Sequence, residues 1–355
     1  MQIVFRCDAS IEIGTGHVMR CITLADALTD QGHQCTFICK NHEGSLINKL
    51  REKGYKVHDL ACKNKAVAAS DLAHSQWLGS SPADDAMLSQ DIIKEVSCDW
   101  LIIDHYGIDI TWESLLRPYT KKIMVIDDLA DREHDCDILL DQNIGRAESD
   151  YRNLVNKSCV LLVGNKYCLL RKQFQDVRDR QDQSCNKYQL QTLLIYFGGT
   201  DPYGITLKII ETLPKKIYST FKVIVIMGSG SKFLEKVKNE CTQRNIELLM
   251  EVSNIASVIN KINVAIVSCG FICYELAYME VPAIYFGLSK IQNKVAFHLE
   301  QQGLGIALNL DKYKKYDYNL IINNTLKIDR NNFVDFKENG TYKVIKKIIG
   351  ITNGH

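Results

Sequence analysis

The sequence lacks the marks of several classes of protein. Its 43 Lys and Arg residues almost balance its 42 Asp and Glu residues, and the net charge of +1 gives no electrostatic reason to expect a nucleic-acid partner. No apolar run reaches the roughly 18 residues that a membrane-spanning helix needs. Asp8 also interrupts the apolar start of the chain, where a signal peptide would continue. We therefore expect a cytoplasmic protein without a membrane span.

The chain has no Cys-x-x-Cys motif, although it contains 13 cysteines. They are dispersed, and pairs spaced four apart, such as Cys269 and Cys273, have no clustered histidines beside them. An odd, dispersed set fits neither a disulfide framework nor a zinc cage. We expect reduced thiols that pack as small apolar groups, as is typical of a reducing compartment.

The length and apolar content are those of a globular protein. At roughly 150 residues per domain, a chain of 355 residues predicts two domains. With 46% hydrophobic and 24% charged residues, the composition excludes a disordered chain. No repeat of about 20–50 residues is visible.

Short runs rich in Val and Ile alternate with longer segments of helical period. This alternation is typical of parallel strands joined by crossover helices, and the apolar centres of the runs indicate strands covered on both faces. We expect strands at residues 3–5, 34–38, 56–59, 100–103, 122–126, 138–140 and 160–162, and then at 192–197, 222–227, 246–250, 264–268 and 283–286. The fold predicted is α/β, with two Rossmann-like, doubly wound domains.

The polar stretch 172–189 has little to bury and is interpreted as a linker. We predict an N-terminal domain over residues 1–175, a second domain over 190–310 and a closing helical segment over 311–355.

The first loop after a predicted strand contains Gly14, Thr15, Gly16 and His17 at the start of a helix. Ligands of open α/β sheets bind outside the carboxyl ends of the strands, and a helix N-terminus attracts anions. A histidine there can act as a general base near neutral pH. The alternative is a plain turn at the start of a helix, with His17 as a capping or surface residue.

A second strand is followed by Asp104, His105, Tyr106 and Gly107. This turn gathers an acid, an imidazole and a phenol, which packing does not require, although Asp104 could also cap a helix. After the next strand, the adjacent acids Asp127 and Asp128 could bind a metal, but capping or pairing with bases is more common. We predict no metal site.

Two glycine turns follow strands of the second half. Gly199 and Thr200 belong to one, which can present amide groups to phosphate. Gly270 belongs to the other, where Cys273 and Glu275 begin a helix. Glu275 could accept hydrogen bonds from ribose hydroxyls or simply complement the helix dipole.

Together these motifs resemble the nucleotide-sugar hydrolase family of pseudaminic acid biosynthesis, which releases UDP from UDP-2,4-diacetamido-2,4,6-trideoxy-beta-L-altropyranose. The similarity extends over about the first 300 residues. It is carried by residues 6–10, 13–20, 101–107, 126–128, 136–140 and 198–201 and by Glu275. The family is similar to inverting glycosyltransferases of GT-B architecture, so the resemblance implies two Rossmann-like domains with a cleft between them.

The resemblance also implies roles for individual residues. His17 would be the base that activates water at the sugar anomeric carbon, with no cofactor or metal, and Asp8, Asp104 and Tyr106 would face the sugar or orient His17. The implied contacts with the UDP-sugar substrate come from Gly14, Thr15, Gly16, Arg20, Gly199, Thr200, Gly270, Cys273, Glu275, Gln292 and Asn293. The product would serve glycosylation of surface proteins such as flagellin.

One turn departs from the family pattern. Phe271, Ile272 and Cys273 stand where the family usually has hydroxyl side chains, which leaves backbone amides to hold the diphosphate. Two other functions are consistent with the same residues. One is an inverting UDP-sugar glycosyltransferase with a sugar or lipid acceptor, and the other is a non-catalytic sensor of nucleotide sugars.

Overall fold

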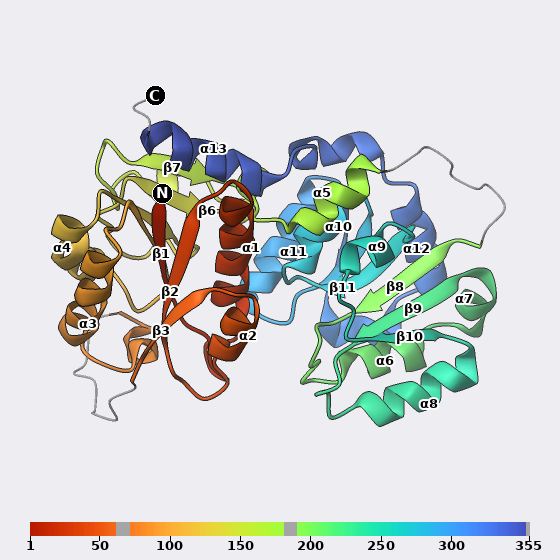
Figure 1. Cartoon of the computed structure of the whole chain (residues 1–355). Helices are drawn as coiled ribbons and strands as arrows, with labels where there is room; N and C mark the ends of the chain where they lie inside the picture. Colours follow the sequence, from red (N-terminus) through yellow and green to blue (C-terminus); the bar gives the residue numbers. More distant parts are fainter. Residues whose placement is uncertain (62–71, 181–189, 353–355) are drawn as a thin grey trace. The chain divides into compact units, whose positions relative to one another are not determined.

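The computed structural model describes residues 1–61, 72–180 and 190–352, which form two compact units. The first unit comprises Met1–Leu169 and Gly340–His355, and the second comprises Leu170–Asn339. Each is built on one parallel sheet (Figure 1).

The first unit contains a seven-stranded sheet in the order β3-β2-β1-β4-β5-β6-β7. Its strands are β1 (Gln2–Cys7), β2 (Gln34–Lys40), β3 (Lys56–Leu60), β4 (Trp100–Asp104), β5 (Lys122–Ile126), β6 (Ile138–Asp141) and β7 (Val160–Val163). Its α-helices are α1 (Gly16–Asp30), α2 (Ile47–Glu52), α3 (Pro82–Glu95), α4 (Ile110–Leu116) and α13 (Gly340–Thr352). Short 3₁₀ helices are η1 (Ser75–Leu78), η2 (Arg117–Tyr119), η3 (Glu148–Asp150) and η4 (Asn165–Tyr167).

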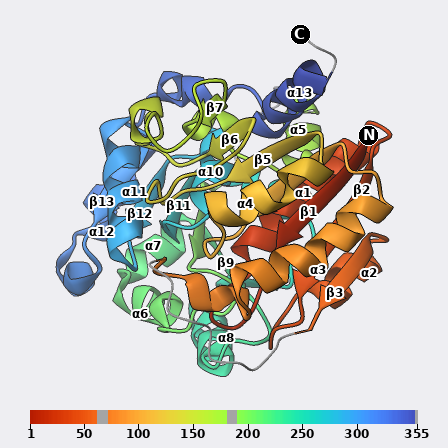
Figure 2. The same cartoon turned by 90° about the vertical axis from the view of Figure 1, so that its left-hand side faces the viewer.

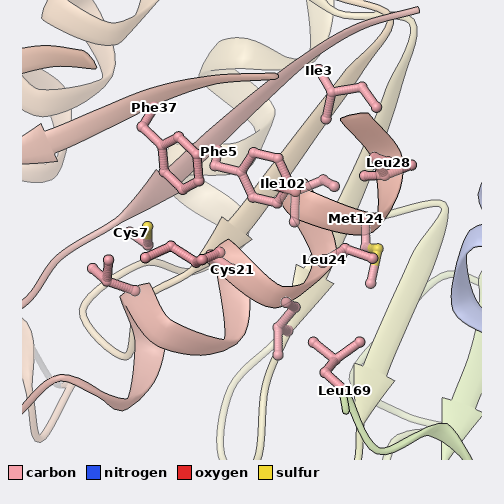
Figure 3. Packing of buried hydrophobic residues seen from close by; sticks show 14 of the residues in the cluster. Ile3, Phe5, Cys7, Cys21, Leu24, Leu28, Phe37, Ile102, Met124 and Leu169 are labelled. Atoms are coloured by element: carbon pink, nitrogen blue, oxygen red, sulfur yellow. The ribbon is translucent and has the colours of Figure 1, made fainter. Parts of the chain in front are cut away.

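Alternate residues of the central strands are buried in two separate hydrophobic cores, one on each face of the sheet. Phe5 and Ile102 pack with α1 and α13 on one face, whereas Val4 and Leu101 pack with α3 and α4 on the other. Figures 1 and 2 show these two helix layers, and Figure 3 shows the α1 side of the sheet from close by. Because both faces are covered, most of the strands have apolar centres, and this is why they stand out in the sequence.

The second unit repeats the plan with six parallel strands in the order β10-β9-β8-β11-β12-β13. They are β8 (Thr192–Tyr196), β9 (Lys222–Met227), β10 (Glu247–Met250), β11 (Val264–Ser268), β12 (Ala283–Phe286) and β13 (Gly305–Leu308). The helices are α5 (Lys172–Asp179), α6 (Ile205–Thr212), α7 (Lys215–Thr220), α8 (Leu234–Arg244), α9 (Ile255–Ile259), α10 (Ile272–Tyr278), α11 (Lys290–Gln301), α12 (Tyr318–Leu326), η5 (Leu310–Lys315) and η6 (Arg330–Phe336). The strand order reverses direction at β1/β4 and at β8/β11, as in doubly wound sheets.

The linker prediction is wrong over residues 172–179, which form α5; residues 181–189 lie outside the described part of the chain. Phe174 of this helix is buried, and Arg178 donates to the carbonyl oxygens of Tyr278 and Phe336 at 2.7 and 2.8 Å. The buried ring, the cation that caps two carbonyl groups and a hydrogen bond from the Tyr278 hydroxyl to Gln175 Oε1 hold this otherwise polar helix in the second unit.

The predicted closing segment 311–355 does not form a single structural unit, because it is divided between the two units. Residues up to Asn339 belong to the second unit, and α13 belongs to the first. Val344, Ile345 and Ile348 of α13 are buried in the same core as α1, and Trp100 Nε1 donates to Thr352 Oγ1 at 2.8 Å. The domains therefore differ from the predicted ranges at both ends of the second unit.

The cysteines among the described residues are free thiols, and most of them are buried. This agrees with the expectation from their dispersed spacing. Every helix in the described part of the chain falls short of the length and apolar content that a membrane crossing requires.

Candidate active site

Polar side chains gather at the carboxyl edge of the first sheet, beside the reversal of strand order. β1 and β4 pair in parallel register with Cys7 opposite Asp104, so the chain leaves both strands at the same edge. From β1 the chain runs into α1, which carries His17 in its first turn and Arg20 one turn later. The topology thus brings His17, Arg20 and Asp104 together.

Asp104 holds both of these side chains. Its Oδ1 lies 2.6 Å from Nδ1 of His17, and the guanidinium of Arg20 donates two hydrogen bonds, Nε to Oδ2 at 2.5 Å and Nη2 to Oδ1 at 2.6 Å. Burial alone would raise the pKa of Asp104, but the charge of Arg20 and the neighbouring His17 hold that pKa well below its ordinary value. Asp104 therefore stays ionised and can only accept, so the hydrogen bond requires a proton on Nδ1 of His17, which donates it to Asp104.

This hydrogen bond fixes the tautomer of His17. With the proton on Nδ1, the lone pair of the neutral ring is on Nε2. Nε2 makes none of the hydrogen bonds found among the described residues, and the His17 side chain keeps 8% of its surface exposed. The arrangement is that of a general base oriented by a carboxylate.

Tyr106 and Asp128 complete this group. The rings of His17 and Tyr106 meet edge to face with centroids 4.5 Å apart, and Arg20 Nη1 donates to Asp128 Oδ2 at 2.8 Å. Burial raises the pKa of Tyr106, and Asp128 raises it further, so the phenol stays protonated and able to donate. Asp128 is thus paired with Arg20, a role that the sequence did not reveal.

Asp8 belongs to a different group of side chains. Its Oδ1 accepts from Arg6 Nη1 at 2.7 Å and from the Lys40 backbone N–H at 2.6 Å, while Oδ2 lies 3.3 Å from Nε2 of His105. Burial alone would raise its pKa, but the charge of Arg6 holds it well below the usual range. Asp8 is fully buried, and its hydrogen bonds and ion pairs go to residues other than His17, so Asp104 orients that ring and Asp8 does not.

Asp8 is one part of a buried ionic network. Arg6 also donates to both carboxylate oxygens of Asp85, and Lys40 Nζ donates to Asp85 Oδ2 at 2.8 Å. Two cations and two carboxylates therefore balance in a region without solvent, where an unpaired charge would be strongly destabilising. The network fixes the ends of β1 and β2 under the candidate site.

The acid next to Asp128 is structural. Asp127 accepts from Tyr151 and from the backbone N–H of Ala130, and it lies 2.8 Å from Arg132 Nη1. Over the ranges that the structure describes, no three His, Cys, Asp or Glu residues form a group suited to a metal ion. Asp127 is therefore held by hydrogen bonds and an ion pair, which is the alternative to metal binding that the sequence left open.

The start of α1 presents unpaired amide groups. Gly14 has a φ of +80°, and Thr15, at the N-cap, makes no side-chain capping hydrogen bond. No atom lies within 4 Å of the position that a Cβ would take on Gly14 or Gly16. The first N–H groups of this helix are thus available to a ligand, and the helix dipole favours a negative one.

In the second unit, the turn after β8 is open. Gly199 and Thr200 are exposed, and the Gly199 carbonyl accepts from the Gly228 N–H at 2.7 Å. Asp201 is buried and caps α6 by accepting from the N–H groups of Ile205 and Thr206. The turn thus has a rigid base and exposed backbone.

The turn after β11 differs from the prediction in one residue. No atom lies within 4 Å of a Cβ on Gly270, whereas Cys273 is fully buried and its Sγ donates to the Ser268 carbonyl at 3.5 Å. Burial raises the pKa of the Cys273 thiol, which stays neutral. Its side chain is packed in the interior of the second unit, so only its backbone could contact a ligand at this turn.

Glu275 is paired with a residue that the motifs did not include. Its Oε1 accepts from Arg171 Nη2 at 2.5 Å, and the carboxylate is almost fully buried. Burial raises the pKa of Glu275, and Arg171 opposes that rise. Because 104 residues separate the partners, no local pattern could have revealed this pair.

Gln292 and Asn293 lie at the start of α11. Gln292 Oε1 accepts from the Leu288 N–H at 2.9 Å, and Asn293 is exposed. The Asn293 side chain also occupies the space where a Cβ of Gly287 would be, so this position requires glycine. Gln292 therefore supports the loop after β12, and Asn293 lies against Gly287 in the same loop.

Solved structures share this fold at low sequence identity. The calicheamicin glycosyltransferase has a TM-score of 0.62 and 13% identity over 100% of this chain and 98% of its own. MurG of Acinetobacter baumannii has a TM-score of 0.58 and 13% identity over 98% of each chain. UDP-GlcNAc 2-epimerase of Neisseria meningitidis, bound to UDP-GlcNAc, has a TM-score of 0.57 and 12% identity, covering 98% of this chain and 99% of its own. The fold is therefore the GT-B architecture of two Rossmann-like units, as predicted.

Curated proteins give a more specific relationship. No protein-family profile matches the chain. It is 32% identical over 308 residues to the UDP-2,4-diacetamido-2,4,6-trideoxy-beta-L-altropyranose hydrolase of Campylobacter jejuni, covering 85% of this chain and 97% of that protein. An uncharacterised protein of Methanocaldococcus jannaschii is 24% identical over 302 residues, covering 83% of this chain and 57% of that protein. The chain belongs to the family of the Campylobacter hydrolase, which confirms the resemblance seen in its motifs.

Proposed function

We propose that this protein hydrolyses a UDP-linked 2,4-diacetamido-2,4,6-trideoxyhexose to UDP and the free sugar, in the biosynthesis of a nonulosonic acid such as pseudaminic acid. The family relationship supports the substrate class. The observation that carries the proposal is the 2.6 Å hydrogen bond between Nδ1 of His17 and Asp104, because it orients a neutral imidazole as a base.

His17 Nε2 takes a proton from water as the water oxygen attacks the anomeric carbon. The new C–O bond forms opposite the UDP, and the bond between the anomeric carbon and the β-phosphate oxygen breaks. The electron pair of that bond leaves on the diphosphate, and the ionised Asp104 stabilises the imidazolium that forms. Removing such a base typically lowers the rate by about 10²–10⁴-fold.

The departing diphosphate needs compensation for its negative charge. In the first unit, the open N–H groups at the start of α1 can supply it. In the second unit, we propose that the turns at Gly199 and Gly270 contact phosphate and that Glu275 accepts from ribose hydroxyls. Gln292 and Asn293 would support the loop beside them. None of these contacts uses a metal ion, so a chelator should leave the rate of UDP release unchanged.

The decisive experiment incubates the pure protein with the UDP-sugar in buffer and follows UDP release. Release without an acceptor supports hydrolysis, and release only after a sugar or lipid is added supports a glycosyltransferase instead. His17→Asn should lower kcat by at least about 100-fold while UDP still binds. His33→Asn, which changes a histidine beside the N-terminus of the chain, is the matched control. Binding of the UDP-sugar with no turnover under either condition would indicate a sensor.

A further inference from the structure

Three aromatic rings extend outward from His17 along one side of the candidate site. The ring of Tyr106, which contacts His17, is stacked on Trp77 with centroids 5.7 Å apart. His74 lies against both, 4.3 Å from the Trp77 ring and 5.5 Å from the Tyr106 ring. We call His74, Trp77 and Tyr106 the aromatic wall.

The aromatic wall is separate from the hydrophobic cores. All three residues are only partly buried. In the described part of the chain, neither Trp77 nor Tyr106 belongs to a core cluster or packs against one as a partly buried neighbour. A tryptophan that keeps apolar surface in solvent, beside an oriented base, is a common feature of ligand sites and gives little to the fold.

The chain around Trp77 is anchored firmly. Leu78 is fully buried in the core beneath α3 and α4, and Ser80 accepts a hydrogen bond from Lys40 Nζ at 2.7 Å. A Cβ on Gly107 would lie only 3.0 Å from the His74 carbonyl oxygen, so glycine at that position allows His74 to approach Tyr106. These contacts hold Trp77 in place while leaving part of its ring exposed.

We propose that the aromatic wall binds the apolar side of the substrate's sugar and thereby selects acetamido and deoxy sugars. This inference rests on the proposed function. Tyr106 contacts His17, the base proposed to activate the attacking water, and the Trp77 ring is stacked on Tyr106, so a sugar held at His17 lies beside both rings. The sugar in the name of the Campylobacter enzyme carries three methyl groups, two on acetamido groups and one at C6. Such groups pack well on aromatic rings.

The diphosphate and the uracil of the substrate fit the aromatic wall less well than the sugar does. The faces of aromatic rings carry partial negative charge, which disfavours a diphosphate there. Uracil could stack on a tryptophan, but a diphosphate separates it from the anomeric carbon and therefore from His17. The sugar is thus the part of the substrate that the position of the wall favours.

Tryptophan fluorescence gives a direct test. The chain has three tryptophans, and Trp100 and Trp112 are fully buried, so Trp77 should report a ligand at the wall. We would use His17→Asn, which should bind the UDP-sugar without consuming it, and measure emission and calorimetric binding in parallel. The UDP-sugar should shift the emission, and UDP alone should not. Adding Trp77→Phe should abolish the shift while UDP still binds.

The outcomes separate this inference from the proposed function. Calorimetric binding of the UDP-sugar without a change in emission, or an equal change with UDP alone, would overturn the wall as a sugar site. No binding of the UDP-sugar at all would overturn the proposed function and the wall with it.

Kinetics provide a second readout. In the otherwise unchanged enzyme, Trp77→Ala should raise KM by about 10-fold with a smaller effect on kcat. Trp77→Phe keeps an aromatic ring, so its KM should lie close to that of the unmodified enzyme. Tyr342→Ala, at a partly exposed tyrosine of α13, is the control and should leave both constants unchanged. An unchanged KM in Trp77→Ala would contradict the proposal.

Discussion

Nδ1 of His17 lies 2.6 Å from Oδ1 of Asp104, although 87 residues separate the two in the chain. The same carboxylate accepts two hydrogen bonds from Arg20. One ionised group therefore orients the proposed base, His17, and also holds a neighbouring cation. Replacing it should affect the reaction far more than the binding of nucleotide.

Asp104→Asn is predicted to lower kcat for UDP release by about 100-fold or more, because a neutral amide neither holds the Nδ1 proton as strongly nor stabilises the imidazolium. Affinity for UDP, measured by calorimetry, should remain within about 2-fold, a change too small to correspond to a lost hydrogen bond. Asp99→Asn is the matched control, since Asp99 pairs with Lys121 before β4 begins. A variant at position 104 that hydrolyses the substrate at the normal rate would contradict the role given to His17.

Glu275→Ala is predicted to weaken UDP binding by about 10-fold or more, the effect of losing hydrogen bonds between a carboxylate and ribose hydroxyls. UMP, which keeps the ribose, should lose affinity in parallel. Glu280→Ala gives the comparison, because Glu280 also pairs with an arginine, Arg178, close to the end of the same helix. Equal affinities of the Glu275 and Glu280 variants for UDP would show that Glu275 serves only its ion pair with Arg171.

The strands could be predicted because strands buried on both faces have apolar centres. Residues 122–126 and 222–227, for example, match β5 and β9 from end to end. β13 was missed because Gly305–Leu308 is a short edge strand that is mostly half-buried. The helix α5 was mistaken for a linker because its polar sequence hides one buried ring, Phe174.

The site was predictable where it depends on topology. His17 and Asp104 follow neighbouring parallel strands, so they had to come close. Which acid would meet His17 was not predictable, because Asp8 and Asp104 both lie at strand ends and only packing directs Asp8 toward Arg6. Arg171 and Trp77 carry no local motif, and their roles depend on contacts that are distant in sequence.

Asp141 gives a prediction about pH and stability. Its carboxylate is buried beside Tyr151 and Arg146, and burial raises its pKa from 3.8 to about 6. Between pH 3.8 and about pH 6, the Asp141 carboxyl therefore binds more protons in the folded state than in the unfolded state. Its contribution therefore makes the protein less stable as pH rises from about 4 to about 6, by about 2–3 kcal/mol in total.

Asp141→Asn removes this titration, so its effect appears in the difference between the unfolding free energies of the unmodified protein and the variant. The free energy of unfolding of the unmodified protein minus that of Asp141→Asn should fall by about 2–3 kcal/mol between pH 4 and pH 7. Denaturant unfolding at several pH values would measure it. Asp137→Asn serves as control, because the pKa of Asp137 is lowered: burial alone would raise it, but hydrogen bonds from the Ile123 N–H and Lys122 reverse that effect. The corresponding difference for that variant should rise with pH mainly below about pH 4 and change little between pH 4 and pH 7. A flat difference for Asp141 would show that its carboxyl titrates normally in the fold.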